Sequence, residues 1–369
     1  MMPEYVNELI PNKINYFSFY FWVITFTLLA AFLPTIPAKA WSSYPYNPKN
    51  PPLSEIDRTP TLLIRSESLF PLVTFPPCEN PGWFPEGFGL KDHHSYWYDG
   101  YYYLVSNQLP DEKRFAVGRS VDLCEWEIMT PILSNRLPGT WDEHGIWAPY
   151  IHEEDGIFYL FYTGVTNEYT QSIMLATSTN PSDPNSWQTQ GVVFQPNHGS
   201  AIWQEGNWAD CRDPTVIKIG NTYYMYYTGR DVEGGIIGIA SSISLHGPWQ
   251  DWGRVFPPSN DMYESPTIIH FGNYYYLFYH LTSAYSKGEY YRISESPFGP
   301  WQPPIFLPRG WAHEFWRNPN GVWYTSFLTD YTISISTITW DNFFQPPLLI
   351  MGDAAYHLLL PLIFYQTPL

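Results

Sequence analysis

Pairs of short strands joined by tight turns recur along most of this chain. The clearest unit is an apolar strand, a turn that contains glycine, and a second strand rich in aromatic residues. Asp-Gly, Gly-Asn and Asn-Gly supply the positive φ angles that two-residue hairpin turns require. The five turns are Asp99-Gly100, Asp155-Gly156, Gly220-Asn221, Gly272-Asn273 and Asn320-Gly321. The pattern therefore predicts five β-hairpins of similar build.

A second signature follows each hairpin, namely a strand of small or β-branched residues, a serine and then a turn with tryptophan. These tryptophans are Trp126, Trp187, Trp249, Trp301 and, in a looser fifth copy, Trp340. The turn glycines are 56, 64, 52 and 49 residues apart, which is the length of one four-stranded blade with its loops. No amphipathic helix of useful length interrupts the pattern. We therefore predict an all-β fold, a five-bladed β-propeller over residues 77–369; a β-sandwich would explain the hairpins but not the five-fold recurrence.

The first 76 residues lack this repeat. Lys13 precedes an apolar run of 18 residues from Tyr16 to Leu33, and Ala38-Lys39-Ala40 offers a small-x-small cleavage site. Residues 1–40 are therefore predicted to be an export signal, although the same run is long enough to serve as an uncleaved membrane anchor. Residues 41–76 are proline-rich and predict an extended linker or strap. We expect a secreted or extracytoplasmic protein with no other membrane contact.

Composition restricts the kinds of partner. Aromatic residues make up 19% of the chain and charged residues only 14%, which argues against disorder. The formal net charge of −17 repels nucleic acid and anionic membranes and suits a neutral ligand such as an oligo- or polysaccharide. An exported protein could pair two of its three cysteines, Cys78, Cys124 and Cys211, and leave one over. The oligomeric state is not determined by these features.

Carboxylates recur at the start of the predicted inner strands, which lie against the axis of a propeller. Alignment of the five copies on their turn glycines places Asp92, Glu264 and His313 eight residues before the glycine and Asp213 seven before it, with Ala148 in the second copy. Like charges held close together push their pKa values apart, which provides one ionised base and one protonated acid. Glycosidic cleavage requires such a pair. The alternative is that these residues cap strand starts or bind a structural ion.

These motifs resemble the five-bladed glycoside hydrolase superfamily of families 43, 32, 62 and 68, and family 43 most closely. The resemblance extends roughly from Cys78 to Pro347. Asp92 stands at the general-base position of family 43, with His93 in place of the usual proline. Three further motifs resemble the Trp-Ala-Pro, Arg-Asp-Pro and general-acid Glu-Gly-Pro motifs; they are Trp147-Ala148-Pro149, Arg212-Asp213-Pro214 and Glu264-Ser265-Pro266.

The resemblance implies a glycoside hydrolase for arabinose, xylose or galactose linkages, with Asp92 activating water and Glu264 protonating the leaving oxygen in an inverting reaction. Asp213 would keep Glu264 protonated. No cofactor is required, but His313 resembles a fifth-repeat histidine directed toward an axial metal ion or water, so a structural calcium ion is an option. A retaining fructosidase-like hydrolase or transglycosylase and a non-catalytic glycan-binding propeller are the alternatives.

Several other side chains are candidates for contact with sugar. Aromatic rings can stack on the apolar C–H faces of sugar rings, and Arg212 is expected to pair with a carboxylate or a sugar hydroxyl. The predicted substrate-binding residues are Trp147, Arg212, His94 and Trp311. Trp83 and Trp208 are further candidate platforms, although tryptophans in a propeller more often belong to the core.

Overall fold

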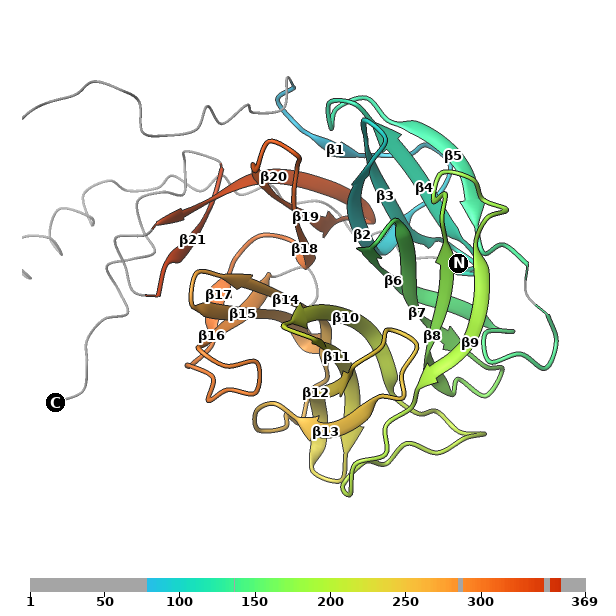
Figure 1. The fold of residues 1–369 in the computed structure, drawn as a ribbon, viewed down its shortest axis with the longest axis vertical. Coiled ribbons are helices and arrows are strands. Elements are labelled where there is room, and N and C mark those ends of the chain that lie inside the picture. The colour runs from blue at the N-terminus through green and yellow to red at the C-terminus, as the bar shows by residue number, and fades with distance from the viewer. Residues whose placement is uncertain (1–77, 136, 285–287, 342–345, 353–369) are drawn as a thin grey trace, which may run out of the picture. The chain divides into compact units, whose positions relative to one another are not determined.

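The computed structural model describes residues 78–352 except residues 136, 285–287 and 342–345 (Figure 1). The predicted export signal at 1–40 and linker at 41–76 lie outside the described residues. In the part of the chain that is described, no helix is both long and apolar enough to cross a membrane.

Five antiparallel sheets account for nearly all of the described structure. Blade 1 consists of β2 (Leu90–Tyr98), β3 (Tyr101–Gln108), β4 (Phe115–Ser120) and β5 (Glu127–Ile132). Blade 2 consists of β6 (Gly145–Glu154), β7 (Ile157–Val165), β8 (Gln171–Ser178) and β9 (Gln188–Phe194). Blade 3 consists of β10 (Cys211–Ile219), β11 (Thr222–Asp231), β12 (Gly234–Ser242) and β13 (Gln250–Arg254).

Blade 4 consists of β14 (Tyr263–Phe271), β15 (Tyr274–Leu281), β16 (Glu289–Ser294) and β17 (Ile305–Leu307), with the short 3₁₀ helix η2 (Thr282–Ala284). Blade 5 consists of β18 (Trp311–Arg317), β19 (Trp323–Thr329) and β20 (Thr332–Asp341), with β1 (Gly82–Trp83) and β21 (Leu348–Met351) both paired to β20. The first strands β2, β6, β10, β14 and β18 contact one another in ring order, including β18 with β2 (Figure 1). The predicted five-bladed propeller is confirmed.

The ring is closed by a strand from its own N-terminal end. Trp83 of β1 pairs with Ile333 of β20 in blade 5, and its indole stacks on Trp126 of blade 1 at 6.0 Å between ring centroids. A disulfide joins Cys78, just before β1, to Cys124 in blade 1. Cys211 remains a free, buried thiol. Two of the three cysteines are therefore paired and one is left over.

The apolar core is divided among the five interfaces between blades. Each interface holds its own cluster of buried aliphatic and aromatic side chains. The tryptophan of each repeat's second signature belongs to one of these clusters, as Trp187 does between blades 1 and 2 and Trp249 between blades 2 and 3. Most of the repeated aromatic residues thus hold blade to blade, which makes the repeat itself the unit of packing.

Every inner strand contains one β-bulge, and this bulge corrects the alignment made from the sequence. The ladder shifts register at the same place in β2, β6, β10, β14 and β18. Inside the bulges, one residue in each blade has a positive φ of 35–56°; these residues are Asp92, Ala148, Asp213, Ser265 and Ala312. Glu264 therefore lies one position before the bulge residue of its strand, and His313 lies one position after.

The displacement of Glu264 by one residue arises from the place of glycine within the turn. Glycine is the second turn residue in blades 1 and 2 but the first in blades 3 and 4. Counting from the first turn residue, Asp92, Ala148, Asp213 and Ser265 all lie seven positions upstream. An alignment on glycine alone therefore displaced Glu264 by one residue.

The disulfide gives the first prediction. The double variant Cys78→Ser, Cys124→Ser should lose about 2–4 kcal/mol of unfolding free energy, because the bond closes a chain segment in the unfolded state. Urea unfolding measures the loss. A reducing agent should lower the stability of the parent and leave the double variant unchanged; equal stability of the two oxidised proteins would contradict the prediction.

Candidate active site

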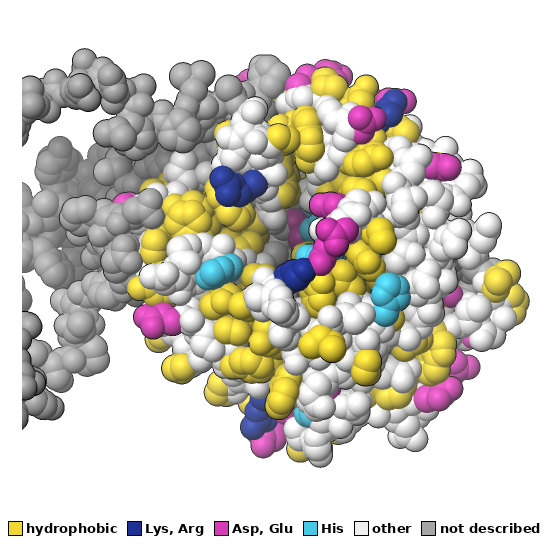
Figure 2. All heavy atoms as spheres, viewed as in Figure 1, with side chains coloured by type: hydrophobic (Ala, Val, Ile, Leu, Met, Phe, Trp, Pro, Cys, Tyr) yellow, Lys and Arg dark blue, Asp and Glu magenta, His cyan; other side chains and the backbone are white. Residues whose placement is uncertain are grey.

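One cavity gathers the charged side chains that the inner strands bring to the bulges. It has a volume of about 140 Å³. Its lining consists of residues at or just before the bulge in blades 1 to 4, together with one tryptophan from the β9–β10 loop. These residues are Lys91, Asp92, Trp147, Trp208, Arg212, Asp213, Glu264 and Ser265. In Figure 2, the centre of the ring face is hollowed, and acidic, basic and histidine side chains lie in and around this hollow. The three predicted catalytic carboxylates are thus neighbours in space.

Asp92 lies in blade 1 with little access to solvent. Its Oδ2 is 3.5 Å from Nδ2 of Asn107, whose Oδ1 accepts a hydrogen bond from the backbone N–H of Ala148 in blade 2. Burial, together with the charges of Asp213 and Glu264 and against the opposing effect of Lys91, raises the pKa of Asp92 to about 7. Asp92 therefore holds a proton more tightly than an ordinary aspartate.

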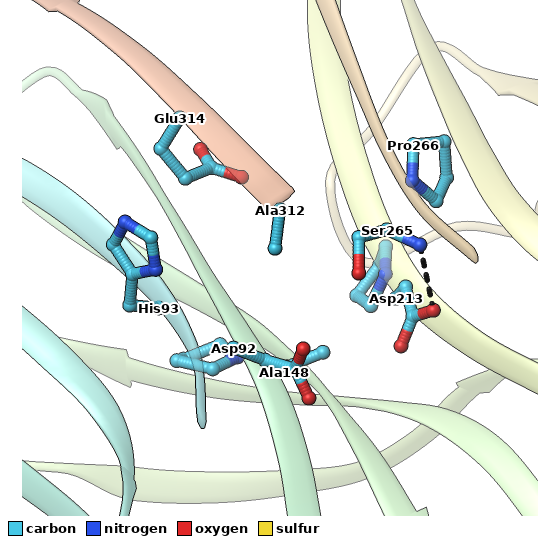
Figure 3. Close-up of a pocket in the computed structure, with 10 residues that line it drawn as sticks. Asp92, His93, Ala148, Asp213, Ser265, Pro266, Ala312 and Glu314 are labelled. Carbon is cyan, nitrogen blue, oxygen red and sulfur yellow. Dashed lines mark hydrogen bonds between the residues drawn. The ribbon is translucent and has the colours of Figure 1, made fainter. Parts of the chain in front are cut away.

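The carboxylate of Asp213 in blade 3 is held by two hydrogen bonds. Its Oδ2 accepts hydrogen bonds from Oγ1 of Thr228 at 2.9 Å and from the backbone N–H of Ser265 at 3.0 Å. Burial raises the pKa of Asp213, an effect that Arg212 opposes and Glu264 supports. Figure 3 shows Asp213 joined to Ser265 across the boundary between blades 3 and 4. Asp213 is consequently both a site residue and a connection between blades.

Glu264 in blade 4 has two basic partners. Its Oε1 accepts a hydrogen bond from Nη2 of Arg212 at 2.7 Å, and its Oε2 lies 3.2 Å from Nε2 of His280. Burial raises the pKa of Glu264, but His280 and Arg212 together outweigh burial and hold it well below its usual range. Arg212 also contacts Asp210 and Asp213, and these carboxylates raise the pKa of its guanidinium despite burial. The expected pairing of Arg212 with a carboxylate is confirmed.

The resting protonation pattern is the reverse of the one expected from the sequence. Asp213 was expected to keep Glu264 protonated by like-charge repulsion. Instead, the pKa of Glu264 is lowered because His280 and Arg212 are its nearest partners, and Asp92 is the carboxyl group with the raised pKa. The pKa values of two carboxyl groups are separated as expected, but the raised pKa belongs to Asp92 and the lowered pKa to Glu264.

A second, smaller cavity of about 20 Å³ lies on the propeller axis, close to the space one water molecule needs. Figure 3 shows Glu314 and His93 on one side of it and Ser265 and Pro266 on the other. His313 is not among the lining residues. Its side chain is fully buried between blades 4 and 5, where Nδ1 hydrogen-bonds to Glu289.

The oxygen donors around this axial cavity decide whether it suits the calcium ion considered from the sequence. Calcium takes six to eight oxygen ligands. Both carboxylate oxygens of Glu314 are engaged, one by Thr267 at 2.9 Å and the other by Nδ1 of His94 at 2.9 Å. Among the described residues, no group of three or more His, Cys, Asp or Glu side chains could hold a metal ion. The residues present therefore do not fit a calcium site on the axis.

The predicted sugar-binding residues divide into two groups. Trp147, Trp208 and Arg212 line the larger cavity. Trp311 is only 6% exposed and packs in the apolar cluster between blades 5 and 1, as does Trp83. His94 is buried against Tyr150 and bound to Glu314 near the axis. His94 lies outside the cavity because it follows the bulge residue by two positions, whereas the lining residues of the inner strands lie at the bulge residue or just before it. Trp311 stands just before its bulge residue but is buried in the interface between blades 5 and 1.

Two further residues of the site were not predicted from sequence. Lys91 lines the cavity, pairs with Glu112 at 3.6 Å and lies 5.8 Å from the Trp147 ring centroid. His280 is the cross-strand partner of Glu264. Corresponding positions opposite the bulges of blades 1 to 3 hold small polar residues, namely Asn107, Thr163 and Thr228. A comparison of second strands among the repeats would have identified His280 as the exception.

Comparison with known proteins agrees with this geometry. Residues 87–202 match the model of the glycosyl hydrolases family 43. The fold is similar to the crystal structure of a thermostable family-43 glycoside hydrolase, with a TM-score of 0.57 and 20% identity, over 76% of this chain and 96% of that one. The chain is therefore a five-bladed propeller, and its residues 87–202 are similar to family 43.

Curated relatives match a smaller part of this chain. It is 26% identical over 160 residues to a probable arabinan endo-1,5-alpha-L-arabinosidase C of Aspergillus flavus, which covers 40% of this chain and 48% of the relative. It is 26% identical over 220 residues to the non-reducing end alpha-L-arabinofuranosidase BoGH43B of Bacteroides ovatus, which covers 56% of this chain and 37% of the relative. The chain thus spans about half the length, or less, of these relatives.

The replacement of proline by His93 leaves the bulge of the family 43-like propeller intact. Proline follows the bulge residue in blades 2, 3 and 4, where the missing N–H costs no ladder hydrogen bond. At the same position in blade 1, His93 places Nε2 2.8 Å from Oγ of Ser326 in blade 5. Asp92 still adopts the positive φ of its counterparts. This departure from the family motif therefore adds a contact between blades and does not displace Asp92.

The raised pKa of Asp92 gives the second prediction, a pH-dependent stability. The ordinary pKa is 3.8 and the native value is about 7, so ionisation between these pH values weakens the native state relative to the unfolded chain. Asp92→Asn cannot ionise. The free energy of unfolding of Asp92→Asn should therefore rise relative to that of the parent between pH 4 and pH 7, by on the order of 2–4 kcal/mol. This difference should persist above pH 7.

Urea unfolding across this pH range measures the difference. Glu125→Gln, which alters an exposed carboxylate, is the control and should show no comparable trend. A difference between Asp92→Asn and parent that is constant with pH would contradict the assignment.

Proposed function

We propose that the family 43-like propeller is a glycoside hydrolase that cleaves α-L-arabinofuranosyl linkages in plant or microbial glycans. The observation that carries the proposal is the grouping of three carboxylates in one cavity, with the pKa of Asp92 raised and that of Glu264 lowered. Glycosidic cleavage needs two carboxyl groups in opposite protonation states. The proposed reaction requires no cofactor.

The proposed chemistry is a single displacement with inversion. Asp92 accepts a proton from a water molecule while the water oxygen attacks the anomeric carbon. The bond from that carbon to the leaving oxygen breaks, and Glu264 supplies the proton that this oxygen takes up. Asp213 and Arg212 stabilise the charge that develops on the sugar and on Glu264. The products are a free arabinose-end hemiacetal of inverted configuration and the shortened glycan.

This assignment requires the proton to move to Glu264 before cleavage. Arg212 and His280 favour the ionised carboxylate of Glu264. We propose that a sugar ring between the carboxyl groups displaces water from Glu264 and strengthens the desolvation that already raises its pKa, while Asp92 gives up its proton. His280 is then a positioning residue, because its contact with Oε2 helps to determine when Glu264 carries the proton.

Support for arabinose as the sugar comes from the relatives, which are named as arabinanase and arabinofuranosidase. A disulfide suits an oxidising compartment, so we propose that the protein acts outside the cytoplasm, as its N-terminal sequence predicts. A glycan-binding propeller without catalysis is the second candidate, and it is favoured by the resting protonation of Glu264. Hydrolysis assays distinguish the two.

The third prediction assigns the acid and the base. Glu264→Gln cannot donate a proton, so it should lose at least about 10³-fold in kcat on an α-1,5-linked arabino-oligosaccharide, whose leaving group is poor. It should retain much more activity on 2,4-dinitrophenyl α-L-arabinofuranoside, whose leaving group needs no proton. Asp92→Asn should lose activity on both substrates, and added azide should restore it on the activated one.

Circular dichroism and thermal unfolding of both variants serve as the folding control. If the two patterns are exchanged, Asp92 is the acid and Glu264 the base. If the parent hydrolyses neither substrate but binds the oligosaccharide, the propeller is a glycan-binding protein.

The fourth prediction tests His280 through the pH profile of kcat, which reports the pKa values of the enzyme–substrate complex, where Glu264 is proposed to carry the proton. His280→Leu removes the hydrogen bond that lowers the pKa of Glu264, so that pKa should rise. The activity of an acid is lost when it deprotonates, and the basic limb of the profile should therefore move to higher pH. His280→Gln retains an N–H donor and should leave the limb closer to that of the parent. A shift of the acidic limb instead would assign Glu264 as the base.

A further inference from the structure

Two loops at the rim of the active-site cavity present stacked aromatic rings to solvent. Trp208, in the loop between β9 and β10, is 61% exposed, and Tyr169, between β7 and β8, is 37% exposed. Their ring planes are 18° apart, with centroids separated by 5.4 Å. The ring of His144 packs on Tyr169 from the side, at 4.5 Å between centroids. Rings this exposed contribute little to the core, since burial from water is the source of that stabilisation.

The two loops are fixed to each other by hydrogen bonds, so the rings are held in place before any ligand arrives. Thr170 and Ala209 form a β-bridge, and the N–H of Gln171 donates to the carbonyl of Ala209 at 3.1 Å. Oγ1 of Thr170 donates to the carbonyl of Asn207 at 2.8 Å. Tyr169 itself has a φ of 61°, a conformation that costs free energy and is found most often at functional sites.

The exposed rings adjoin the cavity that contains the proposed catalytic residues. Trp208 lines the cavity that contains Asp92 and Glu264. Its Nε1 donates a hydrogen bond to Oδ1 of Asp210 at 3.2 Å, and the same oxygen accepts a hydrogen bond from Nη1 of Arg212 at 2.5 Å. The ring of Trp208 is therefore oriented by the same carboxylate that orients the arginine of the site.

The size of the cavity indicates what lies on these rings. A volume of about 140 Å³ is well below the roughly 300–1,000 Å³ of pockets that enclose a drug-sized ligand. Only part of an oligosaccharide can be enclosed, so the adjoining sugar must lie at the rim. Stacked rings without formal charge, on a chain with a formal net charge of −17, suit a neutral sugar whose C–H face is apolar.

We propose that Trp208 and Tyr169 form a binding shelf for the sugar residue next to the one held in the cavity. This inference rests on the proposed function and extends it: the substrate is a chain of at least two sugars, and the shelf favours oligosaccharides over simple glycosides. Trp208 supplies the contact face, and Tyr169 supports it from behind.

The test compares two substrates that differ only in their reach. α-1,5-Arabinotriose extends to the shelf, whereas α-L-arabinofuranosyl fluoride has a leaving group of one atom and cannot. Trp208→Gln keeps an N–H donor for Asp210 but lacks the ring, and it should lower kcat/KM for arabinotriose about 5- to 30-fold. Its kcat/KM for the fluoride should fall by a clearly smaller factor, because the fluoride meets only the part of Trp208 that lines the cavity. Trp208→Phe keeps a ring and should retain most of the activity on arabinotriose.

Trp252→Ala is the matched control. Trp252 is 57% exposed and its Nε1 also makes one hydrogen bond, to Ser241, but it lies on β13, the outer strand of blade 3. Trp252→Ala should leave kcat/KM unchanged for both substrates. Equal losses on both substrates with Trp208→Gln, or no loss on either, would overturn the shelf.

Direct binding separates this inference from the proposed function. If the parent turns over neither substrate, the proposed function fails, and calorimetric titration of parent and Trp208→Gln with arabinotriose still decides the shelf. A weaker affinity of at least fivefold for Trp208→Gln supports it, whereas equal affinity or no binding to the parent overturns it.

Discussion

The architecture of this propeller depends on satisfying the backbone N–H groups that the inner-strand bulges remove from the ladder. A buried N–H without a partner is costly, so each must find an acceptor elsewhere. Side chains of the preceding blade supply these acceptors in blades 2, 3 and 4: Ala148 N–H binds Asn107, Asp213 N–H binds Thr163, and Ser265 N–H binds Asp213. In blade 5, the acceptor for the N–H of His313 is Glu289. Each blade thereby fixes the bulge of the next.

This arrangement explains how strained, charged residues can be held at the centre of the ring. A positive φ at a residue other than glycine costs free energy and persists only where its surroundings determine it. Asp213 serves both purposes, since one of its carboxylate oxygens accepts a hydrogen bond from the following blade and the residue also lines the cavity. Structural and chemical roles therefore cannot be separated at this position, and a substitution there would disturb both.

Much of the fold could be predicted from sequence because the same structural unit occurs five times along the chain. Hairpin turns, blade-length spacing and the recurring tryptophans each have a local physical cause, and all three indicate the same ring. The grouping of Asp92, Asp213 and Glu264 in one cavity followed from their places near the starts of inner strands. These features depend on short segments whose conformation the residues themselves dictate.

The rest depended on distances between blades, which local pattern does not encode. Whether glycine stands first or second in a turn shifted the alignment by one residue in blade 4, and this displaced Glu264. His313 was displaced because blade 5 has one extra residue between its bulge and its turn. The low pKa of Glu264 arises from His280 on the neighbouring strand, whose effect appears only once the bulge brings it opposite. Trp311 shares a strand position with Trp147, yet it is buried between blades 5 and 1, because the packing of each interface decides which rings reach the cavity.

Closure of the ring by β1 affects the order in which the molecule can be assembled. Trp83 pairs with a strand about 250 residues later in the chain, so the last sheet stays incomplete until nearly all of the propeller has been synthesised. Contacts so distant in sequence form late, since the intervening chain must first lose its freedom. The bond from Cys78 to Cys124 spans only the first blade, and it can therefore hold β1 beside blade 1 while the others form. Because the disulfide already holds β1 beside blade 1, closure of the ring requires only that β20 pairs with a strand whose position is fixed.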